Sequence, residues 1–149
     1  MNNVLQFPIN SHDFARVSSF VPEPRRLSVL VAESDRAERS ELKELLDLYG
    51  IAVLEAENGE EAVDLTVREC PNLVLMNAAL PGLDGYEAAR LIRSIQSFDR
   101  MPIIFLSGET ERIFKKRAFD VGADSFHFAP LDFERLDHIL ENFLFRTPV

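Results

Sequence analysis

The chain has 149 residues, enough for one domain with a substantial core and too few for two ordinary domains. Apolar residues make up 46% of the chain and charged residues 28%, which is typical of a globular protein. The 25 Asp and Glu residues outnumber the 16 Lys and Arg residues, so the net charge is −9. This balance argues against nucleic acid as a partner, because neutralising phosphates requires a surplus of basic side chains.

Other functional classes are disfavoured by features that the sequence lacks. Cys70 is the only cysteine, so no internal disulfide can form, and a reducing compartment is expected. No apolar run approaches the ~20 residues of a membrane span, and the first residues lack the basic start and apolar centre of a signal peptide. We therefore expect a cytoplasmic protein without membrane contacts.

Residues 1–26 differ in composition from the rest of the chain. They contain Pro8, Pro22 and Pro24 and show no long hydrophobic period. The larger apolar residues in this arm are Val4, Leu5, Phe7, Ile9, Phe14, Val17, Phe20 and Val21. This composition is too apolar for a disordered tail, and we divide the chain into an N-terminal arm, 1–26, and a folded domain, 27–149.

From Leu27 onward, strand-like and helix-like segments alternate. The predicted strands are 27–32, 52–56, 73–77, 102–107 and 125–129. The predicted helices are 35–50, 59–69, 85–96, roughly 110–121, and 132 to about 145. Three of these helices begin with an Asp or Asn that is followed three residues later by Glu, a pattern typical of a helix N-terminus. The pairs are Asp35 with Glu38, Asn58 with Glu61, and Asp84 with Glu87.

The strands at 27–32, 73–77 and 102–107 are nearly continuous apolar runs, a pattern typical of parallel strands that helices cover on both faces. Five strand–helix units in a row indicate a doubly wound α/β domain. Such sheets carry their sites at the carboxyl ends of the strands. The residues at these ends are Glu33, Ser34, Asp35, Asn77, Ser107 and Ala129.

Four segments, in order, resemble the receiver domain of bacterial response regulators. They are VLVAESD (29–35), LVLMNAALPGLDGYEAARLIR (73–93), PIIFLSG (102–108) and GADSFHFAPLDFERL (122–136). The resemblance covers 27–145 and implies a receiver-like domain of two-component signal transduction. It also implies a flavodoxin-like, five-stranded parallel sheet of order 2-1-3-4-5 with helices on both faces, and a cis peptide bond before Pro130.

The resemblance further implies an Asp that accepts a phosphoryl group, two acids that hold Mg²⁺ with it, a Ser or Thr and a Lys that contact the phosphoryl group, and an aromatic switch residue. In this chain Asn77 takes the phosphoacceptor position, Glu33 and Ser34 take the acidic pair, and Ala129 takes the Lys position. Phe126 takes the aromatic position. Of the residues that would contact the metal or the phosphoryl group, only Ser107 keeps the expected chemistry.

These departures predict a degenerate site, as in a pseudo-receiver. The oxygen of an amide is a poor nucleophile, so no acyl phosphate should form at Asn77. Mg²⁺ relies on carboxylate ligands, and Glu33 alone remains, so we expect Mg²⁺ binding to be lost or weak. With acids and Lys both replaced, the site should be neutralised as a unit, and Asn77 should bond to Ser107 or Ser34.

The leading hypothesis is a phosphorylation-independent signalling module that acts by protein–protein interaction and is not an enzyme. Its partner could be a kinase, another signalling protein, or a second copy bound through the 110–145 face. The alternative is a working phosphorelay response regulator with a non-standard acceptor or metal site, for which Asp35 and Asp84 are candidates. A ligand-binding or enzyme module is disfavoured because no Gly-rich phosphate loop and no Cys/His or Ser/His pair lies near the strand ends.

Overall fold

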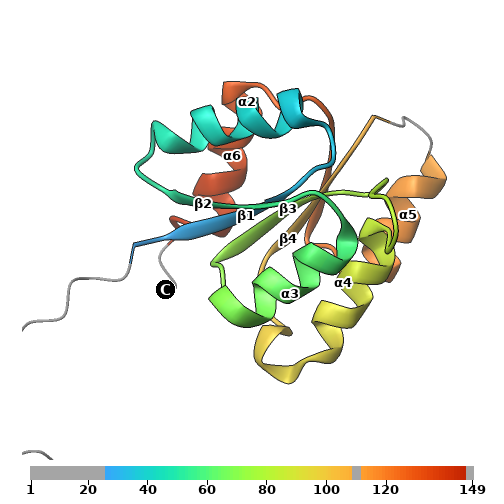
Figure 1. Cartoon of the computed structure of the whole chain (residues 1–149). Coiled ribbons are helices and arrows are strands. Elements are labelled where there is room, and N and C mark those ends of the chain that lie inside the picture. Colours follow the sequence, from blue (N-terminus) through green and yellow to red (C-terminus); the bar gives the residue numbers. More distant parts are fainter. Residues whose placement is uncertain (1–25, 109–111, 147–149) are drawn as a thin grey trace, which may run out of the picture.

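The computed structural model describes residues 26–108 and 112–146 (Figure 1). Almost all of the predicted arm therefore lies outside the described residues, and so does the predicted start of the helix at 110–121. In the described part, five parallel strands form one sheet in the order β2-β1-β3-β4-β5. The predicted flavodoxin-like topology is confirmed.

The strands match the sequence prediction to within one residue at each end. They are β1 (Ser28–Ala32), β2 (Ala52–Ala56), β3 (Leu73–Asn77), β4 (Ile103–Ser107) and β5 (Ser125–Phe128). The helices are α2 (Arg36–Asp47), α3 (Gly59–Glu69), α4 (Gly85–Ser94), α5 (Arg112–Asp120) and α6 (Phe133–Phe143), with a 3₁₀ turn, η2, at Gln96–Phe98. The helix predicted over 85–96 ends at Ser94, because Ile95 adopts an extended backbone conformation (φ −89°, ψ 115°).

Helices α2 and α6 cover one face of the sheet, and α3, α4 and α5 cover the other (Figure 1). Each layer packs an apolar cluster against the sheet, and the central strands β3 and β4 are buried along almost their whole length. Strands covered on both faces have no solvated side, which explains why their sequences are continuous apolar runs rather than alternating ones. The core therefore lies on both faces of the central strands and leaves their carboxyl ends as one shared edge.

All three predicted helix caps form. The side chains of Asp35, Asn58 and Asp84 accept hydrogen bonds from the backbone N–H groups three residues further on, at 2.8–2.9 Å. At α3 the Glu also reaches back, since Glu61 Oε1 accepts from the N–H of Glu57 at 2.7 Å. These bonds satisfy donors that the first turn of a helix leaves unpaired, and they hold α2 and α4 at the edge where β1 and β3 end.

The structure also bears on the expected cis peptide bond before Pro130 and on the search for membrane spans. The Ala129–Pro130 peptide bond is cis, as the family resemblance implied. Within the described part of the chain, no helix combines the length and the apolar composition needed to cross a bilayer.

Candidate functional site

The carboxyl ends of β1 and β3 meet in a direct contact between Glu33 and Asn77. Glu33 follows β1 and is only 3% exposed, and Asn77 is the last residue of β3. The Asn77 amide Nδ2 donates a hydrogen bond of 2.7 Å to Glu33 Oε1. A hydrogen bond to a carboxylate is stronger than one between neutral groups, so this pair stabilises a buried charge that would otherwise be costly.

The remaining oxygens of the pair also have partners. Glu33 Oε2 accepts from the N–H of Asp35 at 2.9 Å, and Asn77 Oδ1 accepts from the N–H of Ala79 at 2.8 Å. Both carboxylate oxygens and the amide oxygen are therefore held by donors of the chain. The predicted hydrogen-bonding role of Asn77 holds, but these partners, Glu33 and Ala79, differ from the serines that the sequence suggested.

A buried arginine, which the sequence analysis missed, supports Glu33 from α2. Arg39 is 8% exposed, and its Nη1 donates to the backbone carbonyl of Glu33 at 2.7 Å. Its other nitrogens pair with Glu55 at 3.1 Å and with Glu57 at 3.5 Å, at the end of β2. Arg39 precedes the core residues Leu42 and Leu46 by three and seven positions, and this helical spacing is the signal that places it on the buried face of α2.

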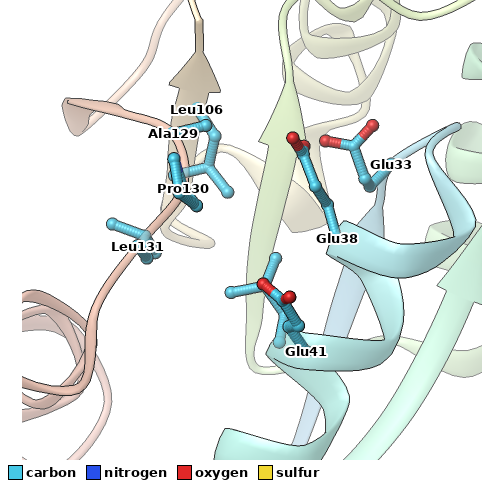
Figure 2. A pocket seen from close by; sticks show the side chains of 8 residues that line it. Glu33, Glu38, Glu41, Leu106, Ala129, Pro130 and Leu131 are labelled. Carbon is cyan, nitrogen blue, oxygen red and sulfur yellow. The ribbon is translucent and has the colours of Figure 1, made fainter.

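A small cavity lies between Glu33 and Ala129, with carboxylates on one wall and the backbone turn after β5 on the other (Figure 2). Its volume of about 10 Å³ is room for about one water molecule. The residues around it are Glu33, Glu38, Glu41, Leu42, Leu106, Ala129, Pro130 and Leu131. A methyl group at 129 leaves this space open, whereas a long side chain at that position would enter it.

The carboxylates on that wall influence one another. Burial, a hydrogen bond with Glu33 and the charges of Glu33, Asp35 and Glu41 raise the pKa of Glu38. Because the folded protein holds a proton on Glu38 more tightly than the unfolded chain does, this carboxyl group opposes folding as it ionises. The strand ends supply one carboxylate, Glu33, and α2 adds Glu38 and Glu41 beside it, so the cavity carries more negative charge than the strand-end positions alone predict.

The other predicted site residues lie around this pair with different exposures. Ser107 ends β4, is buried, and its carbonyl accepts from the N–H of Ala129 at 2.9 Å. Ser34 is exposed at the turn before α2. Phe126 is half-buried on β5 and packs against the apolar cluster under α3, α4 and α5, with its ring edge-on to Phe128. The structure therefore brings four of these residues to the carboxyl edge of the sheet, namely Glu33, Asn77, Ser107 and Ala129. Phe126 instead packs into the layer of α3, α4 and α5.

Asp35 and Asp84, the two acids considered as alternative acceptors, are both occupied as helix caps. Each accepts a hydrogen bond from the N–H of a glutamate in the first turn of its helix. Asp84 Oδ2 also lies 3.8 Å from Arg117 Nη2. Among the described residues, no three His, Cys, Asp or Glu side chains are arranged so that they could hold a metal ion together.

The response regulator receiver domain is the family whose sequence model matches this chain, over residues 29–141. The chain belongs to this family. The match includes all five strands apart from Ser28, the first residue of β1, and reaches into α6, so it includes the edge at which Glu33 and Asn77 meet.

Proteins with similar sequences include response regulator MprA of Mycolicibacterium vanbaalenii, which is 34% identical over 119 residues. That alignment covers 80% of this chain and 51% of MprA, so the chain spans about half the length of that relative. Protein PilH of Pseudomonas aeruginosa is 32% identical over 111 residues, which cover 72% of this chain and 89% of PilH.

A solved receiver of similar structure is that of a sensor histidine kinase from Pseudomonas aeruginosa, whose crystal structure has a magnesium ion coordinated in its active-site cleft. It superimposes with a TM-score of 0.74 and 26% identity, covering 80% of this chain and 98% of that one.

Proposed function

We propose that this receiver domain is a phosphorylation-independent signalling module that acts through protein–protein contact and catalyses no reaction. The observation that carries the proposal is the hydrogen bond between Asn77 and the buried Glu33. In the position that the family resemblance assigns to the phosphoacceptor, this side chain serves as a donor that stabilises a neighbouring carboxylate. A role of that kind needs neither metal nor phosphate.

Phosphoryl transfer to Asn77 is disfavoured by its chemistry and by its contacts. The amide oxygen carries no charge and is a weak nucleophile, and it already accepts a hydrogen bond from the Ala79 N–H. The alternative acceptors Asp35 and Asp84 hold the N-termini of α2 and α4. Transfer to either would withdraw a cap whose loss typically costs about 1 kcal/mol.

Binding of Mg²⁺ is disfavoured by the donor set. The ion requires hard oxygen ligands in near-octahedral geometry and usually relies on carboxylates. The one buried carboxylate at the strand ends, Glu33, has both oxygens engaged by N–H donors, and Ser34 offers no charge. The residues present do not fit the ion, and we propose that the domain is stable without it.

Partner binding is assigned to the face built from α5, β5 and α6, the described part of the predicted 110–145 face. Phe119 and Phe128 on this face are each more than 40% exposed. Apolar side chains of this size at a surface favour burial against another protein. We propose that the partner is a kinase, another signalling protein or a second copy of the domain.

The metal part of the proposal is tested by calorimetric titration with Mg²⁺. The control is the triple variant Ser34→Asp/Asn77→Asp/Ala129→Lys, which restores the residue types that the family resemblance implies. The unmodified protein should show no stoichiometric site at millimolar Mg²⁺, and the triple variant should gain one. A stoichiometric site in the unmodified protein that disappears in Glu33→Gln would contradict the proposal.

A further inference from the structure

An exposed groove between α2 and α6 adjoins the small cavity beside Glu33, with which it shares Glu41 and Leu131. Its volume is about 470 Å³. The residues that line it are Glu41, Glu44, Leu45, Leu48, Leu131, Asp132 and Phe133. Leu48 is 74% exposed and Phe133 is 49% exposed, so the groove presents apolar side chains to solvent, and three carboxylates lie among its lining residues. A surface of this kind favours an apolar segment that carries positive rather than negative charge.

The chain enters the folded domain beside this groove. Arg26 Nε donates to the carbonyl of Gly50 at 2.9 Å, and the carbonyl of Leu27 accepts from the N–H of Ala52 at the same distance. Both bonds fix the start of β1 next to the C-terminal end of α2, at the same end of the domain (Figure 1). Leu48 stands only two residues before Gly50, so whatever precedes Arg26 starts close to the groove.

A segment of the arm that ends at Val21, five positions before Arg26, has matching chemistry. Residues 14–21, FARVSSFV, contain the apolar side chains Phe14, Val17, Phe20 and Val21, and their one charge is that of Arg16. An extended chain spans about 3.3–3.6 Å per residue, so the residues between Val21 and Arg26 suffice to reach along the last two turns of α2, which rise about 5.4 Å each. The segment can therefore place apolar groups on Leu48 and Phe133 and a cation near the carboxylates of the groove.

We propose that residues 14–21 bind in the groove between α2 and α6 of the same molecule. Because the segment is tethered next to the groove, its effective concentration there is high, and weak contacts suffice to keep it bound. The arm then covers the α2 side of α6, and a protein that docks there must first displace it. This inference concerns a different surface from the α5–β5–α6 face and does not depend on how the Glu33–Asn77 site behaves.

Paramagnetic relaxation in the full-length protein tests the inference. Replacing Cys70, which is exposed, by Ser and substituting Ser11→Cys places a single nitroxide label just before the proposed segment. Amide signals of residues 41–48 and 131–133 should lose intensity and recover it when the label is reduced. Leu48→Gln should abolish this loss. The matched control is Leu91→Gln on α4, which changes a leucine that is 47% exposed on the other face of the sheet and should leave the loss unchanged.

Dilution and isotope mixing separate the arm of the same molecule from that of another. The loss of intensity should be independent of protein concentration. It should be absent when isotope-enriched protein without a nitroxide is mixed with nitroxide-labelled protein that carries no isotope. The inference is wrong if the groove signals keep their intensity, if Leu48→Gln has the same effect as Leu91→Gln, or if the broadening appears only between molecules.

Discussion

Replacing Asn77 by Asp probes the Glu33–Asn77 pair most sharply, because it exchanges a hydrogen-bond donor for a second negative charge without changing the shape of the side chain. The Nδ2 atom that would become an oxygen lies 2.7 Å from Glu33 Oε1. Two carboxylate charges about 4 Å apart repel by about 4 kcal/mol at an effective dielectric constant of 20. Relaxation and partial protonation reduce this figure, and we expect Asn77→Asp to lower the free energy of unfolding by about 3 kcal/mol at neutral pH.

The assay is urea unfolding across a range of pH. The repulsion exists only while both groups are ionised, so the deficit of Asn77→Asp relative to the unmodified protein should be largest at neutral pH and should shrink as the pH falls toward about 4. Asn72→Asp is the matched control. Asn72 is exposed, and its Oδ1 accepts from the N–H of Ser28, a bond that a carboxylate can also accept. A variant at position 77 that equals the unmodified protein in stability, or whose deficit does not change with pH, would refute the reasoning.

Two further predictions concern groups whose pKa is shifted. Burial, followed by the contact with Glu33, raises the pKa of Glu38 above the ordinary 4.5. The folded state therefore binds more protons than the unfolded state. The protein loses stability as the pH rises from the pKa of Glu38 in the unfolded chain through its higher pKa in the folded protein. Glu38→Gln should therefore raise the free energy of unfolding at neutral pH and reduce its decrease with rising pH. Glu44→Gln on the same helix should have neither effect. Burial and the 2.6 Å hydrogen bond to Asp137 raise the pKa of Tyr49 to about 12. Tyr49→Phe should remove the late-ionising tyrosine from an ultraviolet absorbance titration and lower the free energy of unfolding by about 1 kcal/mol, and an unchanged titration would contradict this.

Most of the fold could be predicted from local sequence patterns, namely apolar runs and helix-capping residues. The burial and the hydrogen bonds that these patterns indicate are retained in the tertiary structure. The apolar run at 73–77 marks a strand buried on both faces, and Asp84 with Glu87 marks a helix start whose cap forms as expected. The end of α4 was predicted two residues late, since nothing in the local sequence distinguishes the helical turn at Ser94 from the 3₁₀ turn that follows. Residues 1–25 fall outside what the structure describes, so the expectation about the arm stays a prediction.

The site was predicted in its location and only partly in its contacts. Parallel topology brings strand ends to one edge, so Glu33 and Asn77 could be expected to lie close together. The choice of hydrogen-bond partners depends on the length and the rotamer of each side chain. The side chain of Glu33, which is one methylene longer than that of Asp, accepts directly from the Asn77 amide. The contributions of Glu38 and Arg39 come from how α2 packs on β1 and β2. Of these two, Arg39 alone carries a sequence signal, namely its position on the apolar stripe of the helix.

The central claim is that this receiver domain works without phosphorylation, and intact-mass spectrometry after incubation with a small-molecule phosphodonor and Mg²⁺ tests it most directly. A phosphorylatable receiver treated in parallel shows that the donor is active. We expect no gain of a phosphoryl group in the unmodified protein, and little in Asn77→Asp, because Ser34 and Ala129 still lack the metal ligand and the cation. A stoichiometric phosphoryl adduct on the unmodified protein, whether at Asp35, Asp84 or elsewhere, would contradict the account.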